Sequence, residues 1–126
     1  MTFSSNPSIT KVFLPSSIEH TGSRIFINCP NLTSVVIEDG IKHLGPLPFN
    51  GTNLSGHVDI PGSLEEIHSN ICTETNVSSI KVHEGTKKLL YGAFTNISSV
   101  ITTIDLPSTI TSIGESDPTV YGYVTA

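Results

Sequence analysis

The sequence predicts a mostly β fold: a solenoid of about five turns of 22–24 residues, with one stacked parallel sheet, an irregular opposite side and capped ends. Three observations carry this prediction. An apolar anchor recurs once per turn, at Leu14, Ile37, Ile60, Val82 and Leu106. The residues just before an anchor alternate apolar and polar, as in Ile80-Lys81-Val82, which is the period of a half-buried strand. Turn-forming residues follow at once, as in Asp39-Gly40 and Pro61-Gly62.

Other columns of the repeat are also filled by apolar residues. Four residues after the anchor come Ile18, Ile41, Leu64, Thr86 and Ile110. Twelve residues after it come Phe26, Phe49, Cys72 and Phe94. Because each turn of a solenoid buries its apolar face only against its neighbours, we expect these columns to form the core.

The first full turn reads L-P-x-x-I-x-x-x-G-x-x-x-F-x-x-C-x-x-L-x-x-V-x-I and resembles the BspA-like leucine-rich repeat family. The matching residues are Leu14, Pro15, Ile18, Gly22, Phe26, Cys29, Leu32, Val35 and Ile37. Later turns depart from the pattern: His68 and Leu90 replace the glycine, Cys72 replaces the phenylalanine, and Gly56 looks like a one-residue insertion. The resemblance covers roughly residues 9–114 and implies a leucine-rich-repeat solenoid of the kind found in bacterial and protist surface proteins implicated in adhesion and protein binding. It implies no catalytic residues.

The repeat divides the chain into three parts. Residues 1–8 are polar apart from Phe3 and are expected to cap or lead into the solenoid of residues 9–114. Residues 115–126 lie outside the repeat, and Thr119–Ala126 alternates around Tyr121 and Tyr123 as a strand would. This strand either caps the last turn or pairs with another chain, where tyrosines are enriched.

Composition narrows the classes of function. The chain has 126 residues, 13% of them charged, and a net charge of −5, which argues against binding to nucleic acid. No apolar run is long enough to span a membrane, and the first seven residues do not read as a signal peptide. We find no G-x-S-x-G, H-E-x-x-H, C-x-x-C, phosphate-loop or dinucleotide motif, so we expect no enzyme and no cofactor.

The two cysteines can be placed by the repeat. Cys29 lies in the first turn and Cys72 in the third. Two strand spacings separate these turns by about 10 Å, whereas the Cα atoms of a disulfide lie within about 7 Å. We therefore expect two free thiols, with Cys72 buried in the phenylalanine column.

Two groups of polar residues have structural interpretations. His20, His43 and Glu66 share a column six after the anchor, but the next residue in that column is Lys88, so we expect exposed turn residues and no metal site. Asn31, Asn53 and Asn76 each precede an apolar residue. These asparagines begin glycosylation triplets, yet hydrogen bonding to neighbouring backbone within a turn explains them better.

The outer face of the strands is the candidate contact surface. The residue before each anchor points away from the core, which gives the column Phe13, Val36, Asp59, Lys81 and Asp105. Its charged half alternates in sign, as stacked neighbours should. Its apolar half is unusual on a solvated face, and marks either a contact surface or a site covered by the amino-terminal segment.

Two functions follow from these observations. The first is a non-catalytic protein-binding or structural module, at the cell surface or extracellular, that mediates adhesion or protein–protein contact with a surface receptor. The alternative is a virion structural protein, such as a phage capsid decoration or fibre component, in which neighbouring subunits use the solenoid as a rigid multi-copy building block and the chain forms a homo-oligomer. The candidate partner-binding residues are Phe13, Val36, Asp59, Lys81, Asp105, Tyr121 and Tyr123.

Overall fold

The computed structural model describes residues 3–19, 21–46, 48–68, 71–72, 74–94 and 99–115. Within them the regular elements are all strands. They are β1 (Lys11–Leu14), β2 (Ser34–Ile37), β3 (Ser55–Ile60), β4 (Glu66–Ile67), β5 (Asn76–Val82), β6 (Lys88–Leu90), β7 (Thr103–Asp105) and β8 (Ser112–Glu115).

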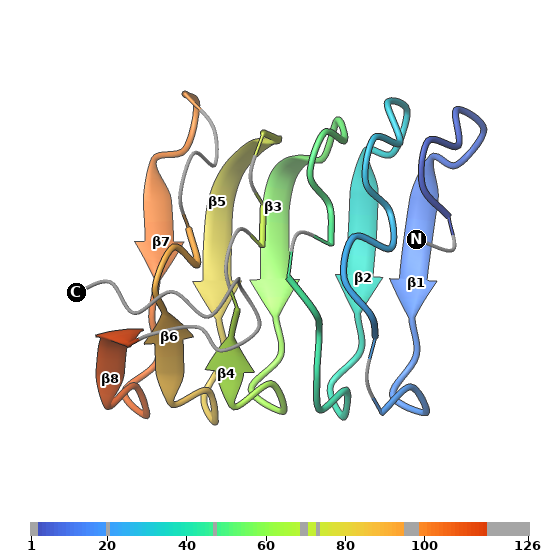
Figure 1. Ribbon diagram of the computed structural model, residues 1–126. Helices are drawn as coiled ribbons and strands as arrows, with labels where there is room; N and C mark the ends of the chain where they lie inside the picture. The colour runs from blue at the N-terminus through green and yellow to red at the C-terminus, as the bar shows by residue number, and fades with distance from the viewer. Residues whose placement is uncertain are drawn as a thin grey trace.

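One strand from each predicted turn lies in a single row, in the order β1, β2, β3, β5 and β7 (Figure 1). All pairings in this row are parallel, and paired residues are one repeat apart, as in Leu14 with Ile37 and Ile80 with Ile104. The prediction of a mostly β solenoid with stacked parallel strands is confirmed. We call the outward-facing side of this row the strand face.

The row is interrupted at one place. Its hydrogen bonds form a two-stranded sheet, β1–β2, and a three-stranded sheet, β3–β5–β7. The amide of Ser55 still donates to the carbonyl of Thr33 at 3.2 Å. The pairing of β3 with β5 then shifts in register between Gly56 and His57, and Gly56 has a φ of +73°. Glycine adopts that backbone conformation without strain. The irregularity expected at Gly56 is therefore present, and it lies beside the division of the sheet.

A second sheet occupies the side that the sequence led us to expect to be irregular. Strands β4, β6 and β8 pair in parallel, with Glu66 beside Lys88 and Lys88 beside Ser112. In Figure 1, β4 and β6 point the opposite way to β3 and β5, as expected when the chain turns back after each anchor. The sheet forms because the same polar–apolar pair recurs at one place in successive turns: Glu66-Ile67, Lys88-Leu89 and Ser112-Ile113.

The core follows the predicted columns. The anchors Leu14, Ile37, Ile60 and Val82 are 7% exposed or less. Leu106, the last anchor, is 38% exposed. The anchor column is therefore buried in the first four turns and partly exposed in the last described turn.

A ladder of phenylalanine rings runs through the first turns and begins earlier than the repeat we identified. Phe26 and Phe49 stack with ring centroids 6.0 Å apart, and Phe3 stacks on Phe26 at 5.3 Å. The amide of Phe3 also donates to the carbonyl of Ile25, and that of Ser5 to Ile27. Phe3 precedes Phe26 by the same 23 residues that separate Phe26 from Phe49, a signal that the sequence carried.

Both cysteines are free and buried, which confirms that prediction. The Cys29 thiol donates to the carbonyl of Phe3 at 3.0 Å. Burial raises the pKa of the Cys72 thiol to about 12 because the thiolate would lose its hydration. Cys72 is therefore protonated at neutral pH and behaves as a small apolar residue.

Polar side chains tie successive turns together. Asn31 donates to the carbonyl of Pro7 at 2.7 Å, and Asn76 donates to the side-chain oxygen of Asn53 at 2.6 Å. The buried Thr86 donates its hydroxyl to the carbonyl of Leu64 at 2.7 Å. The asparagines therefore make structural hydrogen bonds, but these bonds join successive turns, and the bond between Asn76 and Asn53 joins two side chains, whereas bonds to backbone within one turn were expected.

Two glutamates cap neighbouring turns. Glu38 accepts from the Ser16 amide at 2.9 Å, and Glu84 accepts from the Ser108 amide at 2.9 Å and from the Ser108 hydroxyl. The backbone hydrogen bond is the main reason that the pKa of each carboxyl lies below its ordinary value. Both carboxylates are thus held in place at the ends of the turns.

Candidate functional site

The predicted outer column lies on the strand face. Phe13 pairs with Val36, Asp59 pairs with Lys81, and Lys81 pairs with Asp105. Phe13 and Val36 are 58% and 56% exposed, while the residues before and after them turn inward. Residues 3–8 do not cover Phe13, so that alternative is not supported.

The division of the sheet coincides with a change in surface chemistry. The β1–β2 half presents the apolar pair Phe13 and Val36, and the β3–β5–β7 half presents charged residues. The Lys81 ammonium lies 3.8 Å from a carboxylate oxygen of Asp105, and both side chains are at least 49% exposed. An ion pair this long and this exposed adds little to stability.

Two histidines converge on Asp59, and sequence reasoning missed them. The Nε2 atoms of His57 and His83 lie 3.1 and 2.9 Å from the same oxygen, Oδ1 of Asp59. The Ser79 hydroxyl lies 2.7 Å from Nδ1 of His57. An ionised carboxylate only accepts hydrogen bonds, so each Nε2 donates to Asp59. When the imidazole of His57 is neutral, its Nδ1 therefore accepts a hydrogen bond from the Ser79 hydroxyl.

This cluster fixes Asp59 as an anion. The hydrogen bond from His83 is the main cause that lowers the pKa of Asp59; partial burial opposes it, and the bond from His57 adds to it. His57 lies two residues before Asp59 on β3 and therefore shares its face, which is the signal that could have predicted their contact.

Ser79, His57 and Asp59 are the residue types of a hydrolase triad, but their arrangement differs. In that triad the serine bonds Nε2 of the histidine and the aspartate bonds Nδ1. Here Ser79 bonds Nδ1 of His57 and Asp59 bonds Nε2, the reverse of the triad. The side chains of His57 and Asp59 are also 49% and 59% exposed to water. The cluster is a surface hydrogen-bond network that orders the strand face.

A groove of about 610 Å³ lies beside this cluster, where β3, β5 and β7 end. Its apolar lining consists of Ile37, Pro61, Val82, Leu106 and Pro107. Its carboxylates are Asp39, Asp59, Glu84 and Asp105, and Lys81 and His83 also contribute. The four carboxylate residues are exposed, whereas Ile37, Pro61, Val82 and Pro107 are buried beneath them.

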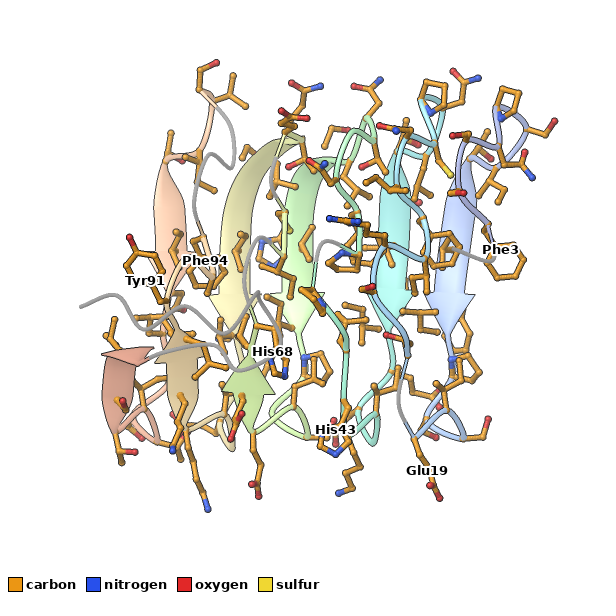
Figure 2. The ribbon with its side chains drawn as sticks, viewed as in Figure 1. Phe3, Glu19, His43, His68, Tyr91 and Phe94 are labelled. Atoms are coloured by element: carbon orange, nitrogen blue, oxygen red, sulfur yellow. The ribbon has the colours of Figure 1, made fainter. Side chains whose placement is uncertain are left out.

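The column of His20, His43, Glu66 and Lys88 was expected at turns, which is wrong for two of its members, because Glu66 lies in β4 and Lys88 in β6. His43 lies at the end of the molecule where β1, β2 and β3 finish, away from the middle of the strand row (Figure 2). It lines a hollow of about 340 Å³ together with Lys42 and Glu66. His20 lies outside the described residues. Across the described part of the chain, no three His, Cys, Asp or Glu residues are placed to hold a metal ion.

Two predicted contact residues fall in the segment after the repeat. Tyr121 and Tyr123, with the whole strand predicted over Thr119–Ala126, lie outside the described residues. The contact role of the strand-face residues stays a prediction.

Comparison with known proteins agrees with this geometry. The family model for the BspA type leucine rich repeat region matches residues 1–117 in six copies, and so begins before the repeat that we identified. The chain matches none of the curated proteins or solved structures with which it was compared. The ranges that the structure describes contain no helix long and apolar enough to cross a membrane. The chain therefore belongs to the BspA-type leucine-rich repeat family.

Proposed function

We propose that this chain is a non-catalytic binding module that contacts another protein through its strand face. Repeats of this family usually take part in protein binding or adhesion and are typically found in surface or extracellular proteins. We accordingly propose that it acts at a cell surface or outside the cell, in adhesion or protein–protein contact.

The exposed pair Phe13 and Val36 is the observation that supports this surface most. Two large apolar side chains lie side by side on a solvated sheet, each more than half exposed. Phe13 and Val36 do not contribute to the core, because the core residues of the same strands, Leu14 and Ile37, face the other side of the sheet. Aromatic residues are enriched in the buried centres of interfaces, where they contribute most of the binding energy.

A peptide-display selection tests this proposal. A random library is selected on the wild-type chain, and each enriched peptide is then measured on Phe13→Glu and on Lys42→Glu, a control at the turns. We expect the enriched peptides to lose about tenfold or more in affinity on Phe13→Glu, because a buried unpaired charge is costly, and to bind the control normally. Peptides that bind all three proteins equally would place recognition elsewhere.

No feature of the described residues favours the alternative of a virion building block. It differs from the first function in requiring many copies, so the molar mass of the chain in solution separates the two. A monomer fits the binding module. A discrete multimer that is lost on deleting Thr119–Ala126 fits an assembly strand.

A further inference from the structure

We propose that the groove on the strand face binds arginine or lysine side chains presented by an extended segment of a partner protein. This inference rests on the proposed function, since it names the chemistry that the strand face recognises. The lining of the groove includes Ile37, the residue after Val36, and the three charged residues of the outer column, Asp59, Lys81 and Asp105.

The charge of the groove is complementary to a cation. Four carboxylate residues line it, whereas its one lysine is Lys81. Such an imbalance attracts a partial or full positive charge and raises the rate at which a basic partner associates. It also penalises a partner that presents carboxylates.

Two of the four carboxylates, those of Asp59 and Glu84, are held in position by hydrogen bonds. Both imidazoles meet the Oδ1 oxygen of Asp59, and its Oδ2 oxygen has no hydrogen bond among the described residues. Glu84 is fixed by the amide and hydroxyl of Ser108. The Lys81–Asp105 contact is long and exposed, so a partner can replace it at small cost. Fixed carboxylates suit the two-pronged hydrogen bonding of a guanidinium group.

The apolar part of the lining distinguishes a basic side chain from a bare metal ion. Leu106, which is 38% exposed, is the apolar lining residue that a side-chain stem can reach, whereas Ile37, Pro61 and Val82 are buried beneath the groove. Arginine and lysine carry aliphatic stems that pack on apolar surface while the charged head stays among polar groups. A metal ion would gain nothing from that surface, and the described residues provide no metal-binding group of three.

A short extended segment is long enough to span the strand face. From β2 to β7 the row advances by three strand spacings, about 14 Å. A segment of about five extended residues covers that distance. Such a segment can place an apolar residue on Phe13 and Val36 and one or two basic residues in the groove.

A direct binding measurement tests the inference. The probe is a fluorescein-labelled, end-blocked octapeptide with one leucine and two arginines, compared with the same peptide carrying citrulline in place of arginine. Citrulline keeps the shape of arginine without its charge. We expect the arginine peptide to bind at least about tenfold more tightly by fluorescence anisotropy, with affinity falling as salt is raised.

Matched variants separate the groove from the overall charge of the chain. The double variant Asp39→Asn, Asp105→Asn removes two carboxylates of the groove, and Glu65→Gln, Glu66→Gln removes two from the hollow beside His43. We expect about a tenfold loss in affinity for the first and less than about twofold for the second. Circular dichroism spectra that match the wild type establish that both are folded. Equal binding of the two peptides, no binding of the arginine peptide up to millimolar concentration, or equal loss in both variants would overturn the inference.

Failure of this inference is distinguishable from failure of the proposed function. If display selection enriches peptides that need Phe13 but contain no excess of arginine or lysine, the strand face binds protein and the groove does not select cations. If no enriched peptide depends on Phe13, the strand face itself is not the binding surface.

Discussion

Replacing the anchor Ile60 by alanine tests the packing of the solenoid against an internal reference. Ile60 lies at the end of β3 and is fully buried, with the anchors Ile37 and Val82 of the adjacent turns also buried. Removing three carbons there leaves a cavity that neighbours on both sides hold open. We expect Ile60→Ala to lower the free energy of unfolding by about 3–5 kcal/mol, the upper part of the range for such substitutions.

Leu106→Ala is the matched control, because Leu106 occupies the same column in the last described turn. It is already 38% exposed, so less apolar surface returns to water when it is truncated. We expect a loss below about 2 kcal/mol. The contrast depends on the structure, since the repeat pattern alone treats the two anchors as equivalent.

Urea unfolding followed by circular dichroism measures both variants. With a urea dependence of about 1–3 kcal/mol per molar, a loss of 3 kcal/mol lowers the midpoint by about 1–3 M. The two free energies can be compared only where the variants keep the same dependence of unfolding free energy on urea concentration. A changed dependence would mean that the turns of the solenoid no longer unfold together. Equal losses in the two variants, or a larger loss for Leu106→Ala, would refute the nearest-neighbour packing described above.

Three further predictions concern the face, the turns and the thiols. Phe13→Glu should change the free energy of unfolding by less than about 0.5 kcal/mol while weakening partner binding; if it unfolds the chain, Phe13 is a core residue. The pKa values of Glu38 and Glu84 are lowered by folding, so their contribution to stability is complete above the ordinary glutamate value of 4.5 and is lost as the pH falls through the lower folded values. Urea midpoints should therefore drop on acidification, and less so in Glu38→Gln, Glu84→Gln; an identical pH profile would show that these caps do not matter. Cys29 and Cys72 should resist a thiol reagent in the native state and yield two thiols in denaturant without reductant; fewer than two would reveal a disulfide.

The sequence predicts the strand face well because two periods act together. The repeat of about 23 residues places equivalent residues in adjacent strands, and the period of two within a strand decides which side each residue takes. Phe13 and Val36 are exposed, and Leu14 and Ile37 are buried, for this reason. Any shift of one residue in the alignment of the turns would have exchanged the two sets.

Features that depend on a single residue were harder to predict. The register shift at Gly56 lies in the pairing of β3 with β5, beside the division between β2 and β3, and a single glycine gives no periodic signal for either feature. The contact of His83 with Asp59 reaches across turns from a residue just after the strand, where no periodic rule fixes the side chain. Phe3 belongs to the aromatic ladder by its spacing. It was missed because the polar residues around it show none of the other apolar positions of the repeat.

The division of the row and the change in surface chemistry fall at the same place. The half before β3 offers apolar contact area, and the half from β3 onward offers ordered charge. Apolar contacts supply binding energy with little selectivity, whereas fixed charges select among partners. On the proposed function, the first half would supply affinity and the second half would supply specificity.

The strand face can be tested as a binding surface by NMR chemical-shift mapping. An isotopically labelled chain is titrated with a peptide obtained from the display selection, and the amides that shift are located on the structure. We predict the largest changes in β1, β2, β3 and β5, around Phe13, Val36 and Lys81. Changes concentrated in β4, β6 and β8, with the strand row unaffected, would contradict this and place the binding surface on the second sheet.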